Sequence, residues 1–150
     1  MRGGLTEKRG RGRPKNPPGV PNHNPKFEIR LRPEVEAWDT QMKALSVKQP
    51  WANLIAEGRK TLEIRSWRTN LRGEILIVSS RKGGRGIEGP FGVTLCRVDI
   101  VDVRRFTPSD EPLAHLDWSP GLWAWVLRNP VRIEQRPVLG KLGIFEVEPP

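Results

Sequence analysis

The sequence is poor in the side chains that nucleophilic and metal-dependent catalysis commonly use. Among its 150 residues it has one cysteine, Cys96, two histidines and no tyrosine. A single cysteine excludes an internal disulfide framework and favours a reducing compartment. The histidines, His23 and His115, lie in different regions without clustered partners. We therefore expect no zinc site, no histidine-dependent triad, no other metal and no cofactor.

Long apolar runs are also missing. No run approaches the roughly 20 residues that a membrane-spanning helix needs, and the start of the chain does not have the pattern of a signal peptide. Cys96 lies in a strand-like run and is interpreted as a small core residue. The expectation is a monomer without a membrane partner.

Positive charge is what the chain has in excess. The formal net charge is +9 and the pI is about 10.6. Such an excess attracts polyanions, and nucleic acid is the commonest of these. The alternative is a basic surface without a specific partner. The first 20 residues carry six cations and one acid, which is more than half of the net charge.

Composition divides the chain into three parts. Residues 1–25 consist mainly of Gly, Pro, Arg, Lys and Asn without apolar periodicity, which predicts a disordered basic arm. Residues 26–41 are a connector, in which Pro33 either begins a short helix or continues an extended chain. Residues 42–150 have the regular patterns of a folded domain.

The folded part is predicted to be mainly β, in the α+β class, with one or two short helices. One short helix begins at Pro50 and ends at Gly58, and residues 107–121 are predicted to be a loop rich in proline. Many short strands with few helices indicate a small, strongly bent sheet or barrel. The predicted strands are 42–47, 60–67, 75–78, 91–103, 122–127 and 142–147.

The arm contains a short motif suited to the minor groove of AT-rich DNA, which is narrow and strongly negative. Glycine lets the backbone approach the groove floor, the flanking arginines reach along it, and proline favours an extended chain. This is the core of an AT-hook, and the alternative is a generic basic tail. The residues concerned are Arg9, Arg11, Gly12, Arg13, Pro14 and Lys15, with Lys8 also in reach of phosphates.

Several motifs of the folded part, in order, resemble the ASCH domain family. They are ALSVKQPWA at 44–52, GRKTLEIRSWRT at 58–69, Arg72-Gly73, GLWAWVL at 121–127 and GKLGIF at 140–145. The resemblance implies a PUA-like β-barrel, related to domains that bind RNA and in some branches modified bases. With the lone cysteine, it also implies a bacterial, archaeal or phage-encoded cytoplasmic protein, associated with the nucleoid if it binds DNA.

The resemblance places a ligand groove beside the turn at Gly58-Arg59-Lys60. Cations there are expected to hold phosphates, a carboxylate to accept from a base edge, and tryptophans to stack on bases. Structural roles remain the alternative: Trp51 packs its helix against the barrel, Trp123 and Trp125 share one side of a strand and face the core, and Glu63 with Arg65 forms a structural ion pair. The candidate residues for nucleic-acid binding, with DNA favoured and RNA the alternative, are Lys48, Trp51, Lys60, Thr61, Glu63, Arg65, Trp67, Arg68, Arg72 and Arg81.

Catalysis is the competing hypothesis. Some ASCH proteins are amidohydrolases that act on N4-acylated cytidine, with a lysine, a threonine and a glutamate as working residues, and ribonuclease activity has also been attributed to the family. Lys60 matches the lysine, but Glu63 stands where such enzymes carry a threonine nucleophile, and a carboxylate cannot replace a hydroxyl without changing the mechanism. If the chain is an enzyme, Lys60 and Glu63 are the candidates. An adaptor role in a larger assembly is the third hypothesis.

Overall fold

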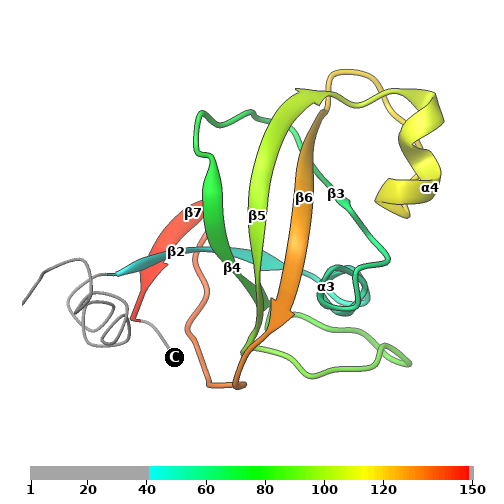
Figure 1. Cartoon of the computed structure of the whole chain (residues 1–150). Coiled ribbons are helices and arrows are strands. Elements are labelled where there is room, and N and C mark those ends of the chain that lie inside the picture. The colour runs from blue at the N-terminus through cyan, green and yellow to red at the C-terminus, as the bar shows by residue number, and fades with distance from the viewer. Residues whose placement is uncertain (1–40, 149–150) are drawn as a thin grey trace, which may run out of the picture. The chain divides into compact units, whose positions relative to one another are not determined.

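The computed structural model describes residues 41–148 of the chain, and these form a mainly β domain. The predicted arm with Arg9 and Arg11–Lys15, and residues 26–40 of the connector, lie outside the described residues. The strands are β2 (Met42–Val47), β3 (Leu62–Arg65), β4 (Gly73–Ser79), β5 (Thr94–Arg105), β6 (Trp123–Arg132) and β7 (Ile144–Val147). The helical elements are α3 (Trp51–Ala56), the 3₁₀ turn η2 (Pro108–Asp110) and α4 (Glu111–Ala114) (Figure 1).

The six strands form one mixed sheet in the order β3-β6-β5-β4-β2-β7. β2 and β4 are parallel, and every other neighbouring pair is antiparallel. The long strands β5 and β6 shift register twice, at Arg97/Asp99 and at Ile100/Asp102. Such bulges increase the local twist of a sheet, and the sheet is strongly curved (Figure 1). The predicted fold class is thus confirmed.

The curved sheet is barrel-like, but backbone pairing within residues 41–148 leaves β3 and β7 as its edges. A side chain spans part of the opening: Arg65 Nη2, on β3, donates to the Ser46 carbonyl of β2 over 2.8 Å. A cation thus bridges β3 and β2, and a cavity lies beside this bridge.

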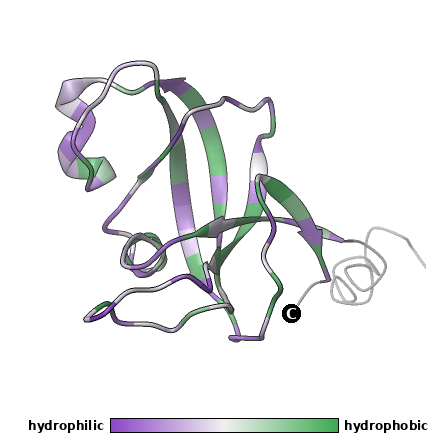
Figure 2. Ribbon diagram, turned by 180° about the vertical axis from the view of Figure 1, so that it is seen from behind, coloured by the Kyte–Doolittle hydropathy of each residue, from purple (hydrophilic) through white to green (hydrophobic). Residues whose placement is uncertain are grey.

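The main core cluster packs α3 against β2, β4, β5 and β6, and a second cluster lies on the other face of β2 and β4. Trp125 is 0% exposed and lies among apolar residues from α3, β2, β4 and β5. Apolar and polar residues alternate along the middle of β5 (Figure 2), as in a half-buried strand, whereas Ile75–Val78 of β4 are all apolar and buried because both faces of that strand are covered. The interpretation of Trp125 as a core residue is confirmed, and Trp125 is not available to stack on a base.

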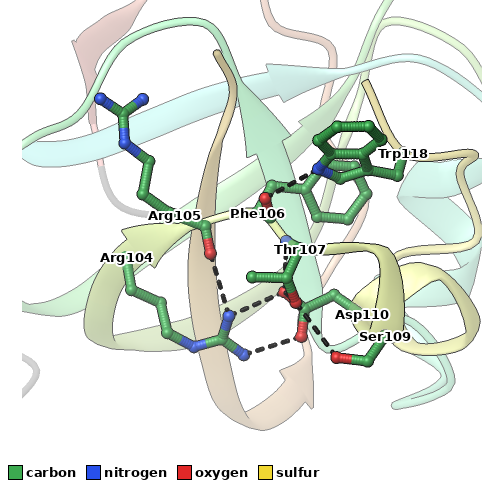
Figure 3. Close-up of polar contacts among 7 residues, drawn as sticks. All are labelled: Arg104, Arg105, Phe106, Thr107, Ser109, Asp110 and Trp118. Carbon is green, nitrogen blue, oxygen red and sulfur yellow. Dashed lines mark hydrogen bonds and ion pairs between the residues drawn. The ribbon is translucent and has the colours of Figure 1, made fainter. Parts of the chain in front are cut away.

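The segment 107–121 differs from the predicted loop because it contains η2 and α4. Asp110 organises it: its carboxylate accepts from the Thr107 backbone N–H and hydroxyl, each at 2.9 Å. Arg104 donates to both carboxylate oxygens, at 2.8 and 3.1 Å (Figure 3). Threonine three residues before an acid is a signature of a helix start, and this signal had been obscured by the prolines around it.

Asp110→Ala is expected to lower the free energy of unfolding at pH 7 by about 1–2 kcal/mol, the usual cost of losing a helix-start carboxylate. The gain from the ion pair is modest because Arg104 is 42% exposed and screened by solvent. The hydrogen bond from Arg104 lowers the pKa of Asp110 from 3.8 to about 2. Since the folded pKa is depressed, this stabilisation is present above pH 3.8 and is lost as the pH falls through about 2.

Urea unfolding of wild type and Asp110→Ala across this acidic range is the measurement. Asp117→Ala, which removes an exposed acid without an ion pair among residues 41–148, is the matched control and should change little. A stability difference between wild type and Asp110→Ala that stayed constant down to pH 2 would contradict the assignment.

Candidate functional site

A cavity of about 680 Å³ lies where the ends of β2 and β4, the edge strand β3 and the segment before β7 meet. We call it the groove. Its residues come from five separate segments of the chain, with Trp51 and Leu116 at its helical side. They are Ser46, Val47, Lys48, Trp51, Lys60, Glu63, Ile64, Arg65, Ser66, Trp67, Ser80, Arg81, Lys82, Leu116, Gly140, Lys141, Leu142 and Gly143.

The groove is strongly basic. Six of its lining side chains are cationic and only one, Glu63, is acidic. Lys60 and Arg65 form ion pairs with Glu63. The remaining four cations have no ion pair with any acid of the described chain: they are Lys48, Arg81, Lys82 and Lys141. A concave surface with uncompensated positive charge concentrates anions.

Strand β3 provides the floor of the groove. Glu63 and Arg65 point towards the groove, whereas Leu62 is buried in the apolar cluster beside α4. Ile64 packs against that cluster and also lines the groove. Glu63 Oε2 accepts from Arg65 Nε at 2.9 Å, and its Oε1 lies 3.8 Å from Lys60 Nζ. The structural ion pair considered from the sequence is therefore present, and it forms part of the groove floor.

Lys60 lies deep in the groove and not at an exposed turn. α3 ends at Ala56, Gly58 adopts a φ of +79°, and the Arg59 and Lys60 amides both bond back to the Leu54 carbonyl. This reversal directs the Lys60 side chain inwards, where it is 2% exposed. Its ammonium donates to the Ala114 carbonyl. Burial lowers the pKa of Lys60, and the nearby Glu63 carboxylate only partly opposes this.

Two half-buried tryptophans line the groove. Trp51 begins α3, and its Nε1 donates to the His115 carbonyl at 2.9 Å, which fixes the indole. Trp67 follows β3 and packs edge-on against Trp125, with 4.8 Å between ring centroids and 86° between planes. The Nε1 of Trp125 donates to the Trp67 carbonyl at 3.2 Å. Each groove tryptophan is thus held by a defined partner and presents an aromatic surface to the cavity.

Seven of the ten candidates predicted in the folded part lie together in the groove. The other three do not. Thr61 lines a separate cavity of about 120 Å³, Arg68 lies against Trp123, and Arg72 donates to the Thr69 and Leu71 carbonyls of its own turn. The seven that the structure brings together are Lys48, Trp51, Lys60, Glu63, Arg65, Trp67 and Arg81.

Sequence reasoning missed the groove residues supplied by loops. Lys82 follows β4, and Lys141 and Leu142 stand between Gly140 and Gly143 before β7. The GKLG run had been noted as a motif without a role. A lysine between two glycines carries no signal of its own for a binding site, and only the sheet topology brings it beside Lys60.

Two other properties concern the described part of the chain alone. None of its histidine, cysteine and acidic side chains gather in groups of three that would hold a metal ion. None of its helices has the length and apolar character needed to cross a membrane.

Comparison with known proteins places the domain. Crystal structures of an ASCH protein from Zymomonas mobilis are similar to it. The unsubstituted protein is 20% identical, with 65% of this chain and 72% of that chain covered and a TM-score of 0.47. A tyrosine-to-phenylalanine mutant is 18% identical, with 65% and 76% covered and a TM-score of 0.48. No curated protein matches the chain. The ASCH domain model matches residues 45–136, more than half of the sequence, and the chain therefore belongs to the ASCH domain family, a PUA-like family with RNA-binding and hydrolase associations.

Proposed function

We propose that the chain is a nucleic-acid-binding protein whose groove holds a phosphate and an unpaired base of a single strand. The observation that carries the proposal is the excess of uncompensated cations in a cavity that also presents two tryptophans. Positive charge follows a phosphate backbone, and aromatic rings supply surfaces on which bases stack. A cavity of about 680 Å³ is in the range of small-molecule sites and has room for one nucleotide.

The groove floor supports contacts to an acceptor-rich ligand. The Lys60 ammonium has three N–H donors, one of which goes to the Ala114 carbonyl while another faces Glu63. Arg65 uses its Nε for Glu63 and its Nη2 for Ser46, and its guanidinium has five donors in all. Both cations thus retain donors that suit a phosphate or an exocyclic carbonyl oxygen.

The N-terminal arm is proposed to add a second mode of binding. Its Arg11-Gly12-Arg13-Pro14-Lys15 motif suits the minor groove of AT-rich duplex DNA. Because arm and domain are parts of one chain, binding by either raises the effective concentration of the other near the nucleic acid. The arm is the reason for favouring DNA, with RNA as the other candidate ligand.

A crossed titration tests both parts. The full chain is titrated with single-stranded DNA, AT-rich duplex and GC-rich duplex at two salt concentrations. Arg81→Gln with Lys141→Gln should weaken single-strand binding roughly tenfold and reduce its salt slope by roughly 0.7, the contribution of one phosphate contact. Arg11→Ala with Arg13→Ala should weaken AT-rich duplex binding more than GC-rich duplex binding.

Arg128→Gln with Arg132→Gln removes two exposed charges of β6 outside the groove and is the matched control. Single-strand affinity that was lost equally in the groove and control variants would refute the groove as the site. An equal loss on both duplexes in the arm variant would reduce the arm to a generic basic tail. Single-stranded RNA, titrated in parallel, decides between the two nucleic acids for the groove.

A hydrolase is the second candidate, because a lysine with a lowered pKa lies beside a carboxylate inside a cavity. Against it, Lys60 is held by Ala114 and Glu63, and a glutamate occupies the place of the threonine nucleophile of related amidohydrolases. Incubation with N4-acetylcytidine is the discriminating assay. Release of acetate that disappears in Lys60→Met would favour the hydrolase over the binding protein.

A further inference from the structure

Trp123, at the start of β6, carries two arginines on its ring. The Arg105 guanidinium carbon lies 4.1 Å from the ring centroid, and that of Arg68 lies 5.4 Å from it. Both distances are within the range of favourable cation–π contact. We call these three residues the arginine–tryptophan patch. None of them lines the groove.

The charge of the patch is not neutralised. Neither Arg68 nor Arg105 forms an ion pair with an acid within residues 41–148, and both are exposed. The neighbouring Arg104 behaves differently, because Asp110 binds it through both carboxylate oxygens. The Arg105 side chain points away from that ion pair (Figure 3), as alternation along a strand requires.

This arrangement is suited to phosphate. A guanidinium that lies on an aromatic ring is oriented by the contact, while its N–H donors, directed along its edges, remain available to an anion. Each guanidinium is thereby held in place before an oxyanion binds, which lowers the entropy lost on binding.

The patch adjoins the groove. Arg65, on the groove floor, is the cross-strand partner of Trp123, and side chains directly opposite on neighbouring strands lie about 5 Å apart. Trp67 lines the groove, and Arg68 follows it in the chain. The residues that connect the groove with the patch are therefore Arg65, Trp67 and Arg68, and none of the three is acidic.

We infer that the arginine–tryptophan patch is a second contact for the single strand held in the groove, and that it binds the phosphate of a neighbouring nucleotide. The inference rests on the proposed function and extends it from one nucleotide to a strand. Binding should therefore depend on ligand length, with the groove sufficient for a mononucleotide and the patch engaged only by an oligonucleotide.

The test compares two ligands, thymidine monophosphate and the all-thymidine octanucleotide, on the full chain. Arg68→Gln with Arg105→Gln is expected to weaken octanucleotide binding roughly tenfold and to reduce its salt slope by roughly 0.7, the contribution of one phosphate. Binding of the mononucleotide should be unchanged. Arg128→Gln with Arg132→Gln is the control of equal charge, and thermal unfolding checks that both variants remain folded. Arg105→Lys, which keeps the charge but not the planar stack, should lose less than Arg105→Gln.

The outcomes separate the patch from the groove. If wild type binds both ligands with the same affinity, no second contact exists and the patch inference fails while the groove stands. Equal losses for both ligands in the patch variant would overturn the inference in favour of an indirect structural effect. If wild type binds neither ligand, the proposed function fails and the patch inference fails with it.

Discussion

Trp125→Ala is expected to lower the free energy of unfolding by about 3–5 kcal/mol, the usual cost of truncating a fully buried tryptophan. The indole is 0% exposed and lies at the centre of the core cluster between α3 and the sheet. Its removal leaves a cavity, ends the edge-on contact with Trp67 and leaves the Trp67 carbonyl without the donor that it now has. Urea unfolding measures the loss.

Trp118→Ala is the matched control. Trp118 is 40% exposed, and its Nε1 donates to the Phe106 carbonyl, so its removal should cost about 1 kcal/mol, the value of one hydrogen bond. Trp125→Phe keeps most of the ring volume and removes only the N–H donor, and it should fall between the two. Equal losses in Trp125→Ala and Trp118→Ala would show that Trp125 is not the centre of the core.

The same substitution connects the core to the groove. Trp67 lines the groove, and Trp125 holds it from behind by ring contact and hydrogen bond. Trp125→Phe should therefore weaken single-strand binding even under conditions in which the variant is fully folded, because the Trp67 ring is less well oriented. The core residue acts through Trp67 and is a positioning residue for the site.

Local patterns predicted the elements with the strongest periodicity. The first strand lies at Met42–Val47 as predicted, and the alternation in β3 directs Glu63 and Arg65 to one face. The helix between them ends before Gly58, and this glycine, which adopts a positive φ, was the signal for the end of the helix. These features depend on neighbouring residues alone, so a single sequence contains them.

The groove was predicted at residues of the motifs 44–52 and 58–69 and at Arg81, and it was missed at Lys82 and Lys141. Lys48 and Arg81 lie in it because β2 runs parallel to β4, which brings the ends of both strands to the same side of the sheet. Lys141 joins them because the segment before β7 leads back to β2. Such contacts depend on topology and register, which a sequence pattern does not fix. Arg68 and Arg72 carried the same local signal as Arg65 and lie outside the groove.

Prolines obscured two further features in the sequence. Pro108 made residues 107–121 look like a loop, although Thr107 and Asp110 have the spacing of a helix start. Pro130 made the strand predicted at 122–127 shorter than β6 is. One register shift between β5 and β6, at Arg97/Asp99, accommodates that proline and the positive φ of Asn129, as is usual for proline in a sheet.

The Lys60–Glu63–Arg65 floor leads to the second large effect. Glu63→Gln is expected to lower the free energy of unfolding by about 3 kcal/mol, because it leaves the buried Lys60 ammonium without its counter-charge. Lys60→Met removes that charge instead and leaves Glu63 paired with Arg65, so it should cost about 1 kcal/mol, for the lost bond to Ala114. The double variant should lose less than the two single losses combined, as expected for residues in contact.

Alkaline pH provides an independent check on Lys60. In the folded chain, burial lowers the pKa of Lys60 below its usual value of 10.5. At pH values between the lowered pKa and 10.5, the unfolded chain therefore binds more protons than the folded chain. Stability attributable to this group therefore rises with pH across that window. The rise should be absent in Lys60→Met and present in Lys43→Met, which removes an exposed lysine of β2.

Measurements of single-strand binding distinguish a structural role of the groove floor from a role in binding the ligand. Lys60→Met should weaken single-strand binding roughly tenfold while costing little stability, because the remaining ammonium donor is then lost to the ligand. Suppose that Lys60→Met keeps full affinity while the wild type shows the rise of stability at alkaline pH. Lys60 would then only order the floor, and the strand would be held by Lys48, Arg81 and Lys141. Loss of affinity without loss of fold would place the ammonium in direct contact with the ligand, since Lys60→Met leaves the Glu63–Arg65 pair in place.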